Sequence, residues 1–203
     1  MTPKRPDNWV ISTRNRHKVD EIHAILTDLH LNLLSLDAFP DAPTVIEDAD
    51  TLEENAAKKS QTLFEFTGLP TVADDTGLEV YALGGAPGVH SARFAGPDCN
   101  DAANRARLLK DLTNKDDRRA QFRTVIAFSS DKGTLFFEGV CEGHIISDER
   151  GDKGFGYDSL FVPTGFETTF AQMAPEQKNA ISHRGRALQR FAAYVISLDS
   201  EAE

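Results

Sequence analysis

The chain has 203 residues, of which 40% are hydrophobic and 27% are charged, a composition typical of a soluble globular protein. Its formal net charge is −10, which argues against general DNA or RNA binding, because such proteins usually carry a basic stripe. A small polyanionic ligand stays compatible with this charge, since it needs only a local cluster of cations or a metal held by carboxylates.

Membrane insertion and secretion are not expected. No apolar run approaches the roughly 20 residues that span a bilayer, and the first ten residues, MTPKRPDNWV, lack the apolar stretch of a secretory signal. Cys99 and Cys141 form neither a CxxC pair nor a metal-ligand cluster. They indicate free thiols, which are typical of the reducing cytoplasm.

The first half of the chain predicts two strands and two helices. Residues 8–13 and 31–36 are expected strands, and apolar side chains at spacings of three and four from Val19 to Leu29 predict an amphipathic helix. Thr51 and Glu54 match a capping box that begins a second helix. That helix should end at Gly68.

In the second half, strands and helices are again mixed. We expect a buried strand at 69–75, a glycine-rich loop at 77–98 and a helix at 101–112. A hairpin around Asp-Lys-Gly should follow at 121–146, then another glycine-rich loop at 149–163 and a last helix at 182–198 that begins at Ser182. This alternation of elements predicts an α/β or α+β fold.

The two carboxylates Asp74 and Asp75 follow an apolar run and are expected at the carboxyl end of a strand, where α/β proteins commonly bind ligands. Neighbouring strand residues point to opposite faces, so one of the pair can face a ligand while the other faces the protein. A hard metal such as Mg2+ takes oxygen ligands and would offset the unfavourable burial of a carboxylate. A turn that merely begins a loop is the alternative.

Two further polar segments suit phosphate groups. Residues 12–18, STRNRHK, lie between a strand and a helix start, where backbone N–H groups favour anions, although the spacing of a Walker loop is missing. Residues 47–59 add Glu47, Lys58 and Lys59 on or before a helix. The alternatives are a solvated basic loop and a solvated helix face.

A last pair of segments suits a nucleobase. Phe155 and Tyr157 flank Gly156, and aromatic faces stack well on bases. Asp158 and His183, with Arg184 next in the chain, offer acceptors and donors for a base edge. Core packing of Phe155 and capping of the last helix by His183 are the alternatives.

Taken together, these segments resemble the ITP/XTP pyrophosphatase family, the non-standard purine nucleoside triphosphate pyrophosphatases. The resemblance rests on five blocks in family order, which are STRNRHKVDEI, TLEENAAKKS, GLPTVADDTGLEVYALGGAPGVHSARFAG, GFGYDSLFVP and EQKNAISHRGRAL. It implies an α/β fold of two lobes around a long mixed β-sheet with flanking helices, and a nucleotide cleft between the lobes.

The resemblance also implies an activity. Family members hydrolyse ITP, dITP and XTP to the monophosphate and pyrophosphate, require Mg2+, and form homodimers. A cytoplasmic hydrolase that removes deaminated purines from the nucleotide pool is therefore expected, with residues 9–198 as one catalytic domain between tails at 1–8 and 199–203. No nucleic-acid or membrane partner is expected.

Roles for individual residues follow from the matching positions. Glu47 and Asp75 would bind the metal, and Asp75 would also accept the proton from the attacking water. The residues implied to hold the triphosphate are Thr13, Asn15, Lys18, Lys59 and Thr76. The residues implied to cover and bind the base and sugar are Phe155, Gly156, Tyr157, Asp158, Lys178, His183 and Arg184.

This chain departs from the family pattern in its loops. Arg14 and His17 stand where glycine is usual or common, Thr76 replaces a serine and keeps the hydroxyl, and Ser159 replaces a proline, a change expected to loosen that loop. Two other functions stay open. One is a pyrophosphatase for a modified pyrimidine or a damaged purine, and the other is a regulatory protein that binds nucleotide without turnover.

Overall fold

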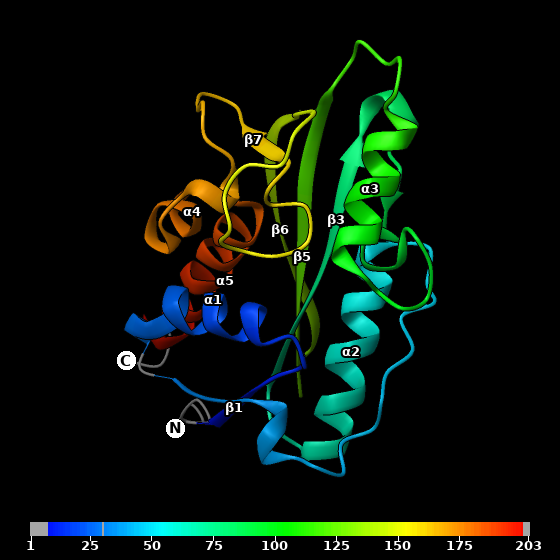
Figure 1. Ribbon diagram of the computed structural model, residues 1–203. Helices are drawn as coiled ribbons and strands as arrows, with labels where there is room; N and C mark the ends of the chain where they lie inside the picture. Colours follow the sequence, from blue (N-terminus) through cyan, green and yellow to red (C-terminus); the bar gives the residue numbers. More distant parts are fainter. Residues whose placement is uncertain (1–7, 30, 201–203) are drawn as a thin grey trace. The chain divides into compact units, whose positions relative to one another are not determined.

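A computed structural model describes residues 8–29 and 31–200, so most of the two expected tails lies outside the described residues (Figure 1). The strands form one seven-stranded sheet in the order β2-β1-β3-β5-β6-β7, with β4 paired to β3. β1 runs parallel to β2 and β3, whereas the pairs β3–β4 and β6–β7 are antiparallel. The predicted α/β class with a mixed sheet is therefore confirmed.

The elements alternate along the chain. The strands are β1 Asn8–Ile11, β2 Asn32–Leu34, β3 Thr71–Val80, β4 Pro87–Gly88, β5 Arg119–Ser130, β6 Gly133–Ile145 and β7 Phe161–Pro163. The α-helices are α1 Arg16–Leu26, α2 Leu52–Thr67, α3 Asp101–Asp111, α4 Pro175–Ile181 and α5 His183–Ser200. Within the described residues, no helix is long and apolar enough to cross a membrane.

The described chain divides into two compact units, which agrees with the two lobes that the resemblance implies. Unit 1 takes in the chain up to Asp75, the segment Val125–Gly139 and the chain from Arg184 onward. Unit 2 consists of Thr76–Thr124 and Val140–His183. The long strands β3, β5 and β6 each begin in one unit and end in the other.

In unit 1, the side chains of β1 alternate between two hydrophobic clusters. Trp9 and Ile11 pack with residues of α1 and α5, including Ile22 and Phe191, while Val10 packs with Leu63 of α2. Figure 1 shows α1 and α5 on one side of these strands and α2 on the other. The period of two in a strand thus places a helix layer on each face of the sheet.

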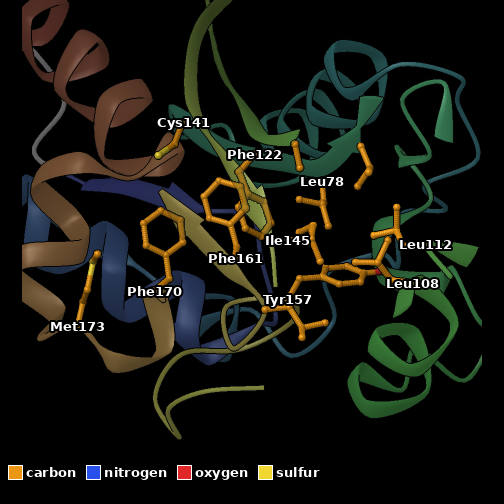
Figure 2. Close-up of a cluster of buried hydrophobic side chains, with 13 residues drawn as sticks. Leu78, Leu108, Leu112, Phe122, Cys141, Ile145, Tyr157, Phe161, Phe170 and Met173 are labelled. Carbon is orange, nitrogen blue, oxygen red and sulfur yellow. The ribbon is translucent and has the colours of Figure 1, made fainter. Parts of the chain in front are cut away.

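Unit 2 has a core rich in aromatic rings (Figure 2). Phe122 of β5 packs against Phe161 of β7 with ring centroids 4.7 Å apart, and Phe161 packs against Phe170 at 5.1 Å. Leu108 of α3 and Tyr157 belong to the same buried cluster. The loop that carries Tyr157 is therefore anchored to the core at this residue.

The structure corrects the prediction for β3. The strand does not end at the acidic pair but continues to Val80, so Asp74 and Asp75 lie in its middle rather than at its carboxyl end. The continuation is stabilised because Leu78 and Val80 keep the two-residue alternation and are fully buried. The Leu78 N–H also donates to Ser91 Oγ at 2.8 Å.

Other element boundaries were predicted well where neighbouring residues mark them and poorly where they depend on distant packing. Thr51 caps α2 by accepting from Glu54 N at 3.1 Å, and Gly68 ends it with a left-handed φ of 68°, as expected. The expected loop at 149–163 ends instead in the short strand β7, and α4 was missed. α5 reaches Ser200, two residues beyond the predicted end of the last helix at residue 198.

We expect Gly77→Ala to destabilise the protein, because a Cβ at residue 77 would lie 2.6 Å from Gly88 O on the neighbouring β4. Overpacking of this kind lowers the free energy of unfolding by about 1–3 kcal/mol. Urea unfolding of the variant and the parent protein measures the change. An unchanged unfolding midpoint would contradict the close approach of β3 and β4.

Candidate active site

The acidic pair on β3 presents its two carboxylates to different helices. Asp74 contacts Lys18 of α1 and Arg184 of α5, whereas Asp75 contacts Lys59 of α2. These helices lie on opposite sides of the strands of unit 1 (Figure 1). The prediction that the two neighbouring carboxylates point to opposite faces is therefore confirmed.

Asp74 is a fully buried carboxylate with several cationic neighbours. Its Oδ2 lies 3.0 Å from Lys18 Nζ, and it accepts hydrogen bonds from Arg184 Nη2 at 3.0 Å and Nε at 3.1 Å. Burial by itself would raise the pKa of Asp74, but the positive charges of Lys18, Arg184 and Lys59 outweigh it and hold the pKa far below its usual range. Asp74 is therefore ionised at every physiological pH.

Arg184 lies between two carboxylates. Its side chain is 1% exposed, and Nη1 donates to Glu21 Oε2 while the other side of the guanidinium faces Asp74. The sequence implied a base or sugar contact for Arg184, and the structure places its guanidinium in this ion-pair network of unit 1. Glu21 was missed, although its position three residues after Lys18 on α1 puts both side chains on one helix face.

Lys59 connects the second carboxylate of the pair to Glu47. Its Nζ lies 2.7 Å from Glu47 Oε2 and 3.2 Å from Asp75 Oδ1. Burial raises the pKa of Asp75, and the nearby Glu47 and Asp74 carboxylates add to that rise, while Lys59 and Lys18 oppose it. Asp75 is thus a more basic carboxylate than Asp74.

Glu47 and Asp75 are the residues that could hold a metal ion in unit 1. Across residues 8–29 and 31–200, no group of three His, Cys, Asp or Glu side chains gathers at metal-ligand distances. Asp75 Oδ2 is nevertheless buried without a hydrogen-bond donor from the described residues. An orphaned carboxylate oxygen next to a second carboxylate fits Mg2+, which binds through one or two carboxylates plus waters and substrate phosphates.

The loop between β1 and α1 organises its own backbone. Asn15 caps α1 by accepting from His17 N at 3.0 Å, and the Asn15 N–H donates to Thr13 Oγ1 at 3.2 Å. Arg14 is exposed and donates to Ala42 O at 3.3 Å. Arg14 and His17, which stand where glycines are usual or common in the family, have no left-handed φ.

The side chain of Lys18 is partly open to solvent. It is 16% exposed, compared with 9% for Lys59. Burial lowers the pKa of the Lys18 ammonium, and the charges of Lys59 and Arg184 add to this, whereas Asp74 opposes it. Ser12, at the end of β1, donates to Lys59 O at 3.1 Å and so ties the loop to α2. Unit 1 therefore brings Lys18 and Lys59 into one electrostatic cluster.

In unit 2, the residues predicted around a base make mostly internal contacts. The Tyr157 hydroxyl donates to Ser91 O at 2.9 Å, and its ring is buried in the core (Figure 2). Asp158 Oδ2 accepts from Phe155 N at 3.0 Å and from Lys178 Nζ at 2.7 Å. Tyr157 and Asp158 therefore fix the loop that carries Phe155.

Phe155 is the aromatic residue of this loop that is half-exposed. Lys178 Nζ lies 5.1 Å from the centroid of its ring, within cation–π distance. His183 is buried and stacks on Phe122 with ring centroids 4.5 Å apart. Thr76 is also in this unit, and its hydroxyl pairs with that of Thr124 at 2.6 Å.

Gly154 was not singled out in the sequence, and it is essential to this loop. Its φ is 73°, and a Cβ there would lie 2.1 Å from Asp158 Oδ2. The left-handed φ and the close carboxylate both require glycine. The sequence signal that could have identified Gly154 is its position two residues before Gly156 in a glycine-rich loop.

A mixed α/β fold that gathers lysines and carboxylates around one strand is typical of proteins that bind phosphorylated ligands with a metal ion. The model of the Ham1 family matches residues 9–194. The chain belongs to the Ham1 family, which confirms the resemblance identified in the sequence.

Relatives and solved structures agree with this assignment. A dITP/XTP pyrophosphatase of Geobacter sulfurreducens is 50% identical over 182 residues, 88% of this chain and 92% of the relative. One of Desulfotalea psychrophila is 45% identical over 185 residues, covering 91% and 83%. The Staphylococcus aureus Ham1 protein superimposes with a TM-score of 0.85 at 38% identity, covering 94% of this chain and 98% of that one.

We expect Arg184→Met to lower the free energy of unfolding by about 3–5 kcal/mol, because it leaves the buried Asp74 carboxylate without its hydrogen-bonded partner. Chemical denaturation measures the loss. Arg16→Met, at an exposed position of α1, is the matched control and should change stability by less than about 1 kcal/mol. Equal effects of the two substitutions would contradict the role of the buried pair.

Proposed function

We propose that this chain is a nucleoside triphosphate pyrophosphatase that hydrolyses ITP, dITP and XTP to the monophosphate and pyrophosphate. The observation that carries the proposal is the lysine–carboxylate cluster of Lys18, Lys59, Asp75 and Glu47 in a chain of the Ham1 family. Relatives up to 50% identical are named dITP/XTP pyrophosphatases. Such an enzyme would remove deaminated purine nucleotides before they enter nucleic acids.

The triphosphate would be held by residues near the start of α1 and on α2. Lys18 and Lys59 supply positive charge, and Thr13, Asn15 and Thr76 supply hydroxyl and amide groups. The exposure of Lys18 and the position of Asn15 at a helix N-terminus support this part of the proposal. Preorganised cations of this kind stabilise charge that develops on a leaving pyrophosphate.

Glu47 and Asp75 would hold Mg2+. The support is the buried Asp75 Oδ2, which has no donor among the described residues, and the position of both carboxylates around one ammonium. When bound, Mg2+ neutralises phosphate charge and makes nearby water more acidic.

Asp75 would act as the proton acceptor. A water oxygen forms a bond to the α-phosphorus, its proton moves to the Asp75 carboxylate, and the bond from the α-phosphorus to the bridging oxygen breaks as pyrophosphate leaves. The raised pKa of Asp75, caused first by burial, makes its carboxylate a stronger base than an ordinary aspartate.

The base and sugar would be bound by the residues that the resemblance implies, most of which belong to unit 2. Phe155 is the candidate stacking surface because it is half-exposed, with Lys178 close to its ring. Gly156, Tyr157 and Asp158 would shape this loop, and His183 and Arg184 would complete the base and sugar contacts. Donors placed for a 6-keto group would reject ATP, because its 6-amino group would leave them unpaired, and the 2-amino group of GTP, which ITP lacks, would disfavour GTP.

From the resemblance we also propose that the chain forms a homodimer and works in the cytoplasm, where nucleotide pools are held. Sedimentation of the purified protein would test the dimer independently of activity.

We expect pyrophosphate release with Mg2+ to be strong from ITP, XTP and dITP and weak from ATP, GTP and dTTP. Release is measured with purified protein at equal nucleotide concentrations. Preferred release from another nucleotide would contradict the base assignment and leave the chemistry intact. Tight binding of ITP without release would instead indicate a regulatory nucleotide-binding protein.

We expect Asp75→Asn to lower kcat for ITP by at least about 10²-fold, because the amide cannot accept the proton and binds metal weakly. Single-turnover kinetics measure the chemical step directly. Asp116→Asn makes the same chemical change at an exposed position and should keep parental kcat. Near-parental turnover of Asp75→Asn would refute its assignment as the base.

A further inference from the structure

Helix α3 holds the two peptide groups that flank the Cα of Gly156. The Gly156 N–H donates to Asp101 Oδ2 at 2.8 Å, and Arg105 Nη1 donates to Gly156 O at 2.9 Å. Asp101 and Arg105 are one helical turn apart, so their side chains share a face of α3. Both hydrogen bonds involve a charged group, which makes them stronger than neutral ones.

A second layer of contacts supports this arrangement. Arg105 Nε lies 2.8 Å from Glu149 Oε2, and Ser159 Oγ donates to the same oxygen at 2.9 Å. Burial would raise the pKa of Glu149, but its ion pair with Arg105 and the hydrogen bond that Ser159 donates to it lower the pKa below the ordinary value. The segment from Glu149 to Ser159 is therefore held to α3 at Gly156, and its two end residues are joined by a hydrogen bond.

The Gly156 N–H that Asp101 accepts from lies in the peptide group that joins Phe155 to Gly156. Gly154 and Gly156 both have left-handed φ values, 73° and 61°, and glycines restrict the backbone least. Tyr157 is anchored in the core and Phe155 is not part of the core cluster. Asp158 holds the Phe155 backbone within the loop, and Asp101 and Arg105 add a restraint on the neighbouring Gly156 from α3.

We propose that Asp101 and Arg105, supported by Glu149 and Ser159, are positioning residues that orient Phe155 toward the base of the substrate. This inference rests on the proposed function, in which Phe155 stacks on the base. The four residues then set the affinity for the base and leave the phosphate chemistry of unit 1 unchanged. Ser159 takes part through its hydroxyl, so the serine at this position restrains the loop.

Steady-state kinetics of Asp101→Ala test the proposal. We expect KM for ITP to rise about tenfold and kcat to change less than about threefold, because a charge-assisted hydrogen bond to the loop is lost while the catalytic groups are untouched. The inhibition constant of inorganic tripolyphosphate, which has no base, should stay at its parental value. A parallel rise in that constant would overturn the proposal, because it would reveal general damage to the enzyme.

Two matched variants separate positioning from a merely structural effect. Asp101→Asn keeps an acceptor oxygen and should restore most of the affinity for ITP. If Asp101 acted only through its negative charge at the start of α3, the uncharged amide would not restore the affinity. Asp111→Ala removes a carboxylate from the other end of α3 and should keep the parental KM. Equal KM values for Asp101→Ala and Asp111→Ala would refute the role of Asp101.

Phe155→Ala distinguishes failure of this inference from failure of the proposed base site. If Phe155→Ala raises KM and Asp101→Ala does not, the positioning role is wrong and the base site stands. If both raise KM, the double variant should be no worse than the more severe single variant, because the two residues act as one. If Phe155→Ala leaves KM unchanged, the base assignment is wrong.

Hydrogen exchange of the Gly156 amide gives a readout that needs no substrate. Asp101→Ala should exchange this amide at least about tenfold faster than the parent, and Asp111→Ala should not. Faster exchange with unchanged KM would show that the restraint exists but does not serve base binding. Unchanged exchange would overturn the restraint itself.

Discussion

The buried carboxylate of Asp74 is the interaction on which the arrangement of unit 1 depends. A lone carboxylate in the middle of a buried strand would be strongly unfavourable, and the cations of α1 and α5 offset that cost. Because Lys18 comes from the first helix and Arg184 from the last, the ion pairs fix both helices against the same strand. Removing any one partner leaves a buried charge, so the network is maintained as a whole.

The contrast between Asp74 and Asp75 shows how one dipeptide serves two purposes. Alternation along β3 turns one carboxylate toward a guanidinium and an ammonium, where its pKa is far below normal. It turns the other toward a site with fewer compensating charges, where burial raises the pKa. A carboxylate that stays charged and one whose pKa is raised can thus be adjacent in the chain without titrating together.

Local signals in the sequence predicted the parts of the fold that are stabilised locally. Thr51 and Gly68 fix the ends of α2 through contacts within a few residues, and both were foreseen. The course of β3 beyond Asp75 was not foreseen, because glycine-rich sequence suggested a loop, and buried packing of Leu78 and Val80 overrode that preference. Short elements such as α4 and β7 depend on the packing of their surroundings and gave no periodic pattern.

The candidate site follows the same division. Lys59, Glu47 and Asp75 were predicted from the family motifs, and the structure brings their charged groups together. The partnership of Asp74 with Arg184 joins residues 110 positions apart, and no spacing rule reaches that far. The contacts of Asp101 and Arg105 with Gly156 are equally remote in sequence, and Ser159, expected to loosen its loop, donates to Glu149 instead.

The crossing of β3, β5 and β6 from one compact unit to the other limits how this protein can be changed by recombination. Neither unit is a continuous stretch of sequence, since each is assembled from separate segments. Exchange of unit 2 with that of a relative would need two simultaneous grafts, with junctions inside strands whose register must be kept. A single crossover would combine half of one core with half of another. Point substitutions, such as those in the loop around Phe155, therefore disturb this fold less than exchange of whole segments.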